Sequence, residues 1–153
     1  PAPCQGNGMA SDRFIVRTDP ELPVEGVLAL YRSAGWWQEG EDPSAIPGIL
    51  RGSLVVASAW IDERLVGMGR AIGDGVSDAY IQDVVVLPEH RGLGIGRALV
   101  REIRDACLAR GLRWIALVAQ PGTGPFYEAL GFREMEGHVP MRWHPAPAEG
   151  DLP

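Results

Sequence analysis

The sequence predicts an α/β fold in a single domain, and three observations lead to this prediction. Its 153 residues suffice for one core, which at this length buries roughly two thirds of the surface of the unfolded chain. An apolar, β-branched run at residues 81–87 passes through a glycine-rich turn at 91–96 into an amphipathic helix. The uniformly apolar segment 114–119 then has the composition of a strand covered on both faces. Strands and helix therefore belong to one folded unit.

The amino-terminal half is expected to contain a strand, two helices and a β-hairpin. Pro47 interrupts the second helix, because a proline inside a helix removes a hydrogen bond. The hairpin turns between two apolar segments. In chain order we expect a strand at 14–17, a helix at about 20–34, a loop at 35–40, a short helix at 43–50, and hairpin strands at 53–61 and 65–72 around a turn at 62–64.

The carboxyl-terminal half is expected to alternate strands and helices. A helix at about 97–110 gathers apolar side chains on one face at helical spacing, and Gly111 is a favourable stop after it. That face consists of Leu99, Val100, Ile103, Ala106 and Cys107. The other expected elements are strands at 78–87 and 114–119, a short helix that holds Tyr127, and last strands at 132–135 and 138–143.

The chain ends are expected to be loose tails, at residues 1–12 and 144–153, around a domain at 13–143. Met9 is interpreted as the natural start. Cys4 and Cys107 lie far apart and are interpreted as free thiols of a reducing cytoplasm, where we expect the protein, with Cys107 as core filler.

Composition narrows the classes of partner. The chain is 46% hydrophobic and 22% charged, as is ordinary for a soluble globular protein. No apolar run approaches the roughly 20 residues of a membrane span, and no signal-like segment is present, so we expect no membrane partner. The net charge of −6 argues against nucleic acid and permits an amine as a partner.

The turn at 91–96 has the features of a phosphate cradle. Glycines let the backbone approach a ligand closely, and the following helix start offers unpaired N–H groups and the positive end of its dipole. The dinucleotide pattern G-x-G-x-x-G fails, since the sixth position is Arg97 or Leu99. The P-loop pattern fails because no Gly-Lys pair exists in the chain. A plain strand-to-helix turn remains the alternative.

What remains is an R-x-x-G-x-G pattern, formed by Arg91, Gly94 and Gly96 after an apolar strand. Here the sequence resembles the GNAT (GCN5-related N-acetyltransferase) superfamily, whose motif A has this form and binds the pyrophosphate of acetyl-coenzyme A. Residues 125–132, Pro-Phe-Tyr-Glu-Ala-Leu-Gly-Phe, resemble the second signature of the family, in which a tyrosine lies near the thioester. A packed aromatic with a partnered hydroxyl is the alternative for Tyr127.

The resemblance covers about residues 13–143 and implies a fold and an activity. The fold is a mixed central sheet of about six or seven strands flanked by about four helices, in the order β-α-α-β-β-β-α-β-α-β-β. The activity is acetyl transfer from acetyl-CoA, as co-substrate and without a metal, to the primary amine of a small molecule by direct attack in a ternary complex. A protein or peptide amine acceptor and a non-catalytic acyl-CoA-binding module are the alternatives. The resemblance leaves a homodimer open.

Specific residues carry over from the family. The backbone of the motif strand would bond the pantetheine arm, and a main-chain N–H of Val85 or Val86 would polarise the carbonyl. Tyr127 is the candidate general acid. The cofactor-binding set is Val84, Val85, Val86, Arg91, Gly92, Leu93, Gly94, Ile95, Gly96 and Arg97. Many members have an asparagine ahead of the Phe-Tyr pair; here either Gln120 or Thr123 replaces it or the contact is missing.

The general base is the least defined part of the site. Strict alternation places Tyr80, Gln82, Val84 and Val86 on one face of the strand and turns Asp83 away. We therefore expect the amine to lose its proton through ordered water held by Gln82. Asp83 is the alternative base, but it is expected instead to be a buried partner of a residue such as Arg70; a β-bulge would reverse its orientation.

The acceptor pocket is expected at the loop after the first helix. Trp36 and Trp37 are flanked there by Glu39, Glu41 and Asp42, and an aromatic wall with carboxylates suits an amine that carries an apolar or aromatic body. One of the two tryptophans is expected to fill the core instead. Tyr80 completes the expected substrate-binding set.

Overall fold

The computed structural model describes residues 14–144, and the chain divides there into two compact units. The first ends at Leu117 and the second begins at Val118. Met9, Cys4, the predicted tail at 1–12 and all but the first residue of the tail predicted at 144–153 lie outside the described residues. No helix among residues 14–144 is both long and apolar enough to cross a membrane.

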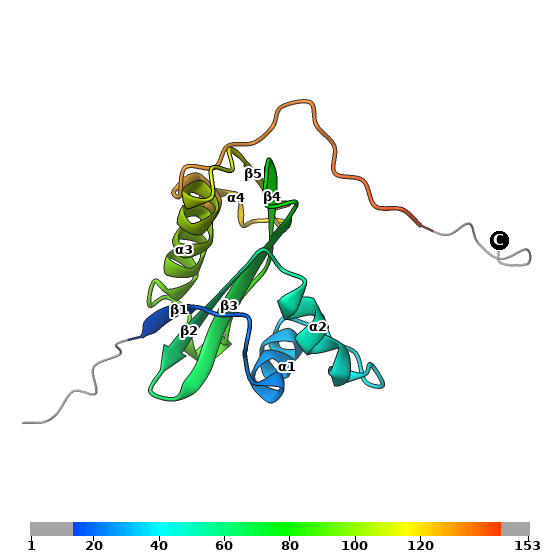
Figure 1. The fold of residues 1–153 in the computed structure, drawn as a ribbon, viewed down its shortest axis with the longest axis vertical. Coiled ribbons are helices and arrows are strands. Elements are labelled where there is room, and N and C mark those ends of the chain that lie inside the picture. The colour runs from blue at the N-terminus through cyan, green and yellow to red at the C-terminus, as the bar shows by residue number, and fades with distance from the viewer. Residues whose placement is uncertain (1–13, 145–153) are drawn as a thin grey trace, which may run out of the picture. The chain divides into compact units, whose positions relative to one another are not determined.

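The first unit is built on a five-stranded mixed sheet, whose strands follow chain order from edge to edge (Figure 1). Neighbouring strands are antiparallel except for the last pair, which is parallel. The strands are β1 (Ile15–Thr18), β2 (Val55–Ile61), β3 (Arg64–Gly73), β4 (Asp78–Val86) and β5 (Trp114–Ala116).

Helices cover both faces of this sheet (Figure 1). Helix α3 (Ile95–Ala109) packs on one face, against the glycines of β3: a Cβ atom at Gly67 would lie 3.2 Å from the side chains of both Ile95 and Leu99. Helices α1 (Val24–Ser33) and α2 (Ile46–Arg51) share the other core layer with Met68 and Val85. Small residues in β3 thus let α3 approach closely, and the larger ones fill the opposite layer.

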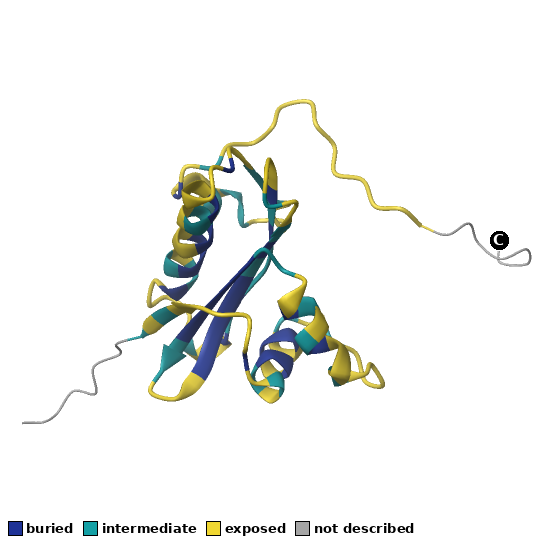
Figure 2. Cartoon of the chain, in the orientation of Figure 1, coloured by how far each residue is buried: buried dark blue, intermediate teal, exposed yellow. Residues whose placement is uncertain are grey.

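The apolar face predicted for α3 is confirmed. Leu99, Val100, Ile103 and Cys107 are fully buried, and only Ala106 is half-buried. Burial also raises the pKa of the Cys107 thiol, as desolvation of a thiolate requires. The buried layers appear as the dark blue inner faces of helix and sheet in Figure 2. Cys107 therefore acts as core filler, as expected.

The predicted interruption at Pro47 is wrong in its position. A 3₁₀ turn, η1 (Pro43–Ala45), comes first, and α2 starts directly after it. Pro47 then falls in the first turn of α2, where its missing N–H would have no helical partner in any case. Proline here helps to begin a helix instead of breaking one.

The second unit contains α4 (Gly124–Glu128) and no strand among its described residues. The strands expected at 132–135 and 138–143 are therefore not formed, and the sheet has five strands instead of six or seven. Alternating Val139, Met141 and Trp143 suggest a strand, but all three are largely exposed. A strand needs a paired neighbour, and these residues have none in residues 14–144. The mixed α/β class and the element order through α4 are confirmed.

Candidate active site

Strands β4 and β5 pair over a short stretch only. Asp78 to Tyr80 of β4 lie beside Trp114 to Ala116 of β5, and β5 ends there. Trp114 is 54% exposed, so the prediction that this strand is covered on both faces is wrong. Beyond Tyr80, the edge of β4 that faces β5 has no strand partner among the described residues. We call residues 81–86 along this side the open edge.

The register fixes which peptide groups reach the open edge. The N–H of Leu87 donates to the carbonyl of Val66 in β3 over 2.9 Å. Because backbone groups alternate along a strand, the N–H and C=O of Val86 point the opposite way, to the open edge. Consistently, the Val86 carbonyl accepts a 3.1 Å hydrogen bond from Nε of Arg91.

Strand β4 contains a bulge at Asp83. The register with β3 shifts between Met68 and Arg70, so that Asp83 and Val84 together face the single residue Gly69. Asp83 has a φ of +54°, a left-handed conformation that costs a non-glycine residue about 1–3 kcal/mol. Such a conformation persists only where surrounding contacts hold it.

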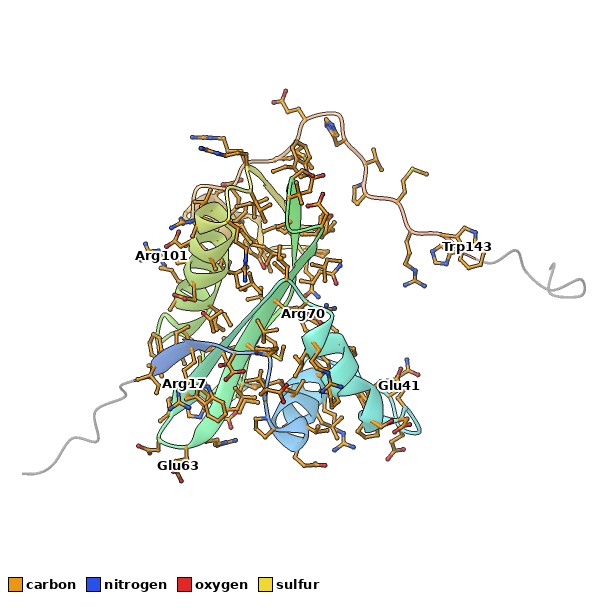
Figure 3. All side chains as sticks on the ribbon, in the orientation of Figure 1. Arg17, Glu41, Glu63, Arg70, Arg101 and Trp143 are labelled. Atoms are coloured by element: carbon orange, nitrogen blue, oxygen red, sulfur yellow. The ribbon has the colours of Figure 1, made fainter. Side chains whose placement is uncertain are left out.

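Those contacts form a polar cluster between the sheet and the helices α1 and α2. The Asp83 carboxylate accepts from the Tyr31 hydroxyl over 2.8 Å and from Nε of Arg70. Arg70 also donates to Gln82 Oε1 over 3.1 Å and to Ser53 Oγ over 3.3 Å. Figure 3 shows Arg70 where the sheet faces the end of α2. Four segments of the chain thus meet in this cluster.

The cluster corrects the expectation of strict alternation. The bulge turns Asp83 to the side that carries Gln82, since both contact Arg70. The predicted ion pair with Arg70 is confirmed. Burial, followed by the charge of Asp83, raises the pKa of Tyr31, so this phenol stays a neutral donor throughout the physiological range.

The turn between β4 and α3 is shaped by two glycines. Gly92 and Gly94 have φ values of +81° and +83°, which L-residues with side chains rarely adopt. A Cβ atom at either glycine would meet no atom within 4 Å, so the turn faces open space. The ion pair between Arg64 and Glu89, at 2.9 Å, ties the short turn η2 (Pro88–His90) ahead of these glycines to β3.

Helix α3 begins without a side-chain cap at Gly94. Within the described part of the chain, no peptide N–H of residues 92–97 donates a hydrogen bond. These groups and the helix dipole make a site for an anion. Arg91 and Arg97 are exposed beside it, whereas the Ile95 side chain is buried, so only the backbone of Ile95 can reach a ligand there.

Two tryptophans follow α1 and lie against the ring of Tyr31. Both ring centroids are 6.1 Å from it, with Trp37 stacked and Trp36 tilted. Trp37 packs on the core, and Trp36 is 37% exposed, so Trp37 is the tryptophan that fills the core. Tyr80, half-buried on β4, makes no ring contact with either tryptophan among residues 14–144.

The geometry described so far is that of a strand with an open edge leading to an anion-binding turn. A family model, described as the acetyltransferase (GNAT) family, matches residues 24–132. The chain belongs to this family. The matched range extends from the first residue of α1 to beyond the end of α4.

Relatives support the same assignment. A protein of rice named serotonin N-acetyltransferase 2, chloroplastic, is 45% identical over 69 residues, which is 45% of this chain and 34% of the relative. A soybean protein named histone acetyltransferase is 31% identical over 146 residues, covering 88% of this chain and 62% of that protein. The chain therefore spans between one third and two thirds of the length of these curated relatives.

A solved structure has the same fold. A GNAT family acetyltransferase from Streptococcus pneumoniae superposes with a TM-score of 0.76 at 26% identity, covering 87% of this chain and 98% of that one. The open edge and the anion-binding turn contain the residues predicted from the sequence to bind acetyl-CoA. Exposed glycines, unpaired N–H groups and Arg91 fit a diphosphate. Among residues 14–144, no group of three or more His, Cys, Asp or Glu side chains could hold a metal ion.

The GNAT tyrosine signature lies in the second unit. Tyr127 belongs to α4, and its ring meets Phe126 and Phe132 edge-on, with centroids 4.9 Å and 6.0 Å away. Burial raises the pKa of its phenol, so this hydroxyl stays protonated at neutral pH. Thr123, one of the two candidates to replace the family's asparagine, donates its hydroxyl to the carbonyl of the other, Gln120, over 2.7 Å. That hydroxyl therefore serves the local turn.

Sequence reasoning about the GNAT site missed one residue, Tyr31. The sequence places it on the apolar face of the first helix, which alone indicates packing. Its hydroxyl is the available signal, because the polar end of a buried tyrosine usually finds a partner. The identity of that partner, Asp83, depends on a bulge that no local pattern reveals.

Proposed function

We propose that this chain transfers the acetyl group of acetyl-CoA to the primary amine of a small molecule by direct attack in a ternary complex. The observation that carries the proposal is the continuity of the open edge of β4 with the uncapped start of α3. Together they offer unpaired peptide groups for an extended thioester arm and a site for its diphosphate.

The donor would be held mainly by the backbone. The N–H groups of residues 92–97, with Arg91, would bind the pyrophosphate, and the open edge at residues 84–86 would bind the pantetheine arm. Of the two candidate donors for the thioester oxygen, Val86 is favoured over Val85. The register supports this choice, because the Val86 N–H points to the open edge. A fixed donor of this kind stabilises the charge that develops on oxygen in the transition state.

The transfer forms a C–N bond and breaks a C–S bond. The neutral amine attacks the thioester carbon, the amine proton passes to ordered water, and the thiolate leaves. Gln82 has its Oε1 occupied by Arg70, so its amide NH₂ is the group that would hold this water. Tyr127 would give its proton to the thiolate and regain one from solvent, which receives the proton of the amine through the ordered water. A thiol, whose ordinary pKa is near 8.5, is an easy leaving group, so this proton can be donated late.

The acceptor is proposed to be an amine with an aromatic or apolar body. Trp36 is partly exposed next to Trp37 and Tyr31, and such an aromatic surface favours a flat or cationic ligand. The name of the rice relative, a serotonin N-acetyltransferase, supports the same class. The carboxylates of Glu41 and Asp42 accept hydrogen bonds from their own loop, so they contribute negative potential more than direct contacts.

A protein amine is the second candidate. The soybean relative that matches most of this chain is named a histone acetyltransferase, and lysine side chains present the same nucleophile as small amines. A flat surface around Trp36 would suit a peptide better than a closed pocket does. The cytoplasmic location, a homodimer, and the expected absence of metal, membrane and nucleic acid stay predictions.

Thiol release from acetyl-CoA, measured across an amine panel, tests the proposal. The panel contains arylethylamines, aliphatic amines, amino sugars and a lysine-containing histone-tail peptide, and acetyl-CoA binding is measured by calorimetry on the same protein. We expect turnover with arylethylamines to exceed turnover with the peptide. Turnover on the peptide alone would indicate the protein acceptor. Binding without turnover on any amine would indicate a non-catalytic acyl-CoA-binding module.

A further inference from the structure

Tyr31 connects two parts of the candidate site that belong to different elements. Its ring, on α1, contacts both Trp36 and Trp37. Its hydroxyl donates to Asp83 of β4 over 2.8 Å, across 52 positions of sequence. Among the described residues, two side chains donate to Asp83, and only Tyr31 of these two also contacts the tryptophans. Arg70, the second donor to Asp83, lies within the sheet on β3.

The conformation of Asp83 decides which peptide group reaches the open edge. With the bulge, Val85 pairs with Met68 and Val86 with Gly67. Without it, every later residue of β4 would slip by one position, and Val85 would take the place of Val86. Since backbone groups alternate with a period of two, a slip of one residue reverses the direction of each of them. The Val86 N–H would then point into the sheet, and the Val85 N–H that replaced it at the open edge would lie one residue further along the chain from Arg91 and the glycine turn.

We propose that Tyr31 is a positioning residue for acyl transfer, whose hydroxyl holds Asp83 in the left-handed conformation and so directs the Val86 N–H to the thioester. The inference rests on the proposed function and assigns no contact between Tyr31 and either substrate. Arg70 alone would not suffice, because it sits on β3 and can follow β4 if the strand changes register. Tyr31 is anchored outside the sheet, in a helix whose face is buried.

The direct readout is the vibration of the bound thioester. Acetyl-CoA labelled with ¹³C at the carbonyl gives a band in infrared difference spectra, and a hydrogen bond to its oxygen moves this band to lower frequency. The measurement needs binding but no turnover, and so it is separate from the choice of amine. We expect the wild-type chain to lower the frequency relative to free acetyl-CoA.

Tyr31→Phe removes the hydroxyl and keeps the ring against both tryptophans. We expect it to lose most of the infrared shift, and to lower kcat on the order of tenfold while KM for acetyl-CoA changes by less than about twofold. The matched control is Thr18→Val. Thr18 Oγ1 also donates to a carboxylate over 2.8 Å, that of Glu102 on α3, and this bond involves no residue of β4. The control should keep the shift and kcat.

Substitutions of Asp83 give the second arm. Asp83→Asn keeps an oxygen acceptor for Tyr31, and asparagine tolerates the left-handed region well; we expect it to keep the infrared shift. Asp83→Ala should lose the shift as Tyr31→Phe does. Adding Tyr31→Phe to Asp83→Ala should cause no further loss, because both remove the same interaction. If Tyr31→Phe does not fold, the comparison of Asp83→Asn with Asp83→Ala tests the inference instead.

The outcomes separate the inference from the proposed function. A full infrared shift in folded Tyr31→Phe, or an equal loss in Thr18→Val, overturns the positioning role. A wild-type chain that binds acetyl-CoA without any shift overturns the Val86 donor and the positioning role together. A wild-type shift that depends on Tyr31, combined with no turnover on any amine, supports the positioning role and contradicts the transferase.

Discussion

The guanidinium of Arg91 is hydrogen-bonded through Nε to the carbonyl of Val86, at 3.1 Å. This bond joins the last residue of β4 to the start of the glycine turn, across the five positions that separate them. Because Nε is used, both Nη groups of the exposed side chain remain for an anion. The bond also fixes the guanidinium beside the open edge, between the places proposed for the thioester arm and the diphosphate.

The first prediction concerns acetyl-CoA affinity. We expect Arg91→Ala to raise Kd about 10- to 100-fold, since hydrogen bonds to charged groups contribute about 1.5–3 kcal/mol. The Kd of Arg91→Lys should lie between those of wild type and Arg91→Ala, because lysine lacks the forked guanidinium that can bond the Val86 carbonyl and the phosphate at the same time. Calorimetry with acetyl-CoA measures both. Arg101→Ala is the control, since Arg101 is exposed on the outer side of α3 (Figure 3). An equal rise in Kd for Arg101→Ala would indicate that Arg91 contributes only general positive charge.

The second prediction concerns proton donation. We expect Tyr127→Phe to lower turnover at least about tenfold, the low end for a general acid, with acetyl-CoA affinity nearly unchanged. Burial raises the pKa of the phenol, so the proton stays on the side chain across the working pH range. Steady-state kinetics and calorimetry on the same preparations check this. Unchanged turnover would return Tyr127 to a packing role against Phe126 and Phe132.

The third prediction separates the two tryptophans. Trp37 packs on the core of the first unit, so Trp37→Ala should lower the free energy of unfolding by about 2–4 kcal/mol, as removal of a large core side chain does. Trp36→Ala should leave stability nearly unchanged and raise KM for an aromatic amine several-fold. Urea unfolding and kinetics with one arylethylamine measure both. Reversed effects of the two substitutions would move the acceptor surface to Trp37.

The fourth prediction concerns the turn that joins β3 to β4. Hydrogen bonds from the Ser77 hydroxyl and then from the N–H groups of Ser77, Val76 and Asp78 lower the pKa of Asp74. Because the pKa of Asp74 is lower in the folded state, its carboxylate stabilises the fold at pH values above the unfolded pKa of about 3.9. This contribution is lost as the pH falls through the pKa of the folded state. Asp74→Ala should therefore lower Tm at neutral pH, with a difference from wild type that shrinks in acid.

Glu63→Ala is the control for that turn, because Glu63 is exposed at the tip of the β2–β3 hairpin (Figure 3). Its effect on Tm should be small and should not follow the same acid dependence. Thermal unfolding of the three proteins between about pH 3 and pH 7 distinguishes them. A difference for Asp74→Ala that stays constant into acid would contradict the role of the carboxylate charge.

Local patterns were sufficient for the parts of the site that lie close in sequence. The β-branched run, the glycines at 92 and 94, and the spacing of Leu99 and Ile103 predict β4, its turn and α3. Each of these features acts within a few residues, through φ angles or helical periodicity. The Arg70–Asp83 pair could be considered in advance for a similar reason, since it requires only two neighbouring strands.

Features that depend on distant partners could not be predicted. Asp83 is held in its left-handed conformation by Tyr31, which belongs to another element. The period-two alternation of side chains therefore fails at Asp83 because of a residue outside 80–86. The segment with Val139, Met141 and Trp143 shows the converse. Its alternation is typical of a strand, but a strand forms only where an edge is available to pair with it.

The open edge of β4 has an evolutionary consequence. A donor that is recognised through peptide groups is recognised through what all twenty amino acids have in common. Drift at positions 84–86 can then replace one aliphatic residue by another while the acyl carrier stays the same. Selection for new acceptors would act on the loop that carries Trp36 and Trp37. Tyr31 would be constrained, because a substitution there that suits a new acceptor would also disturb the binding of the acyl donor.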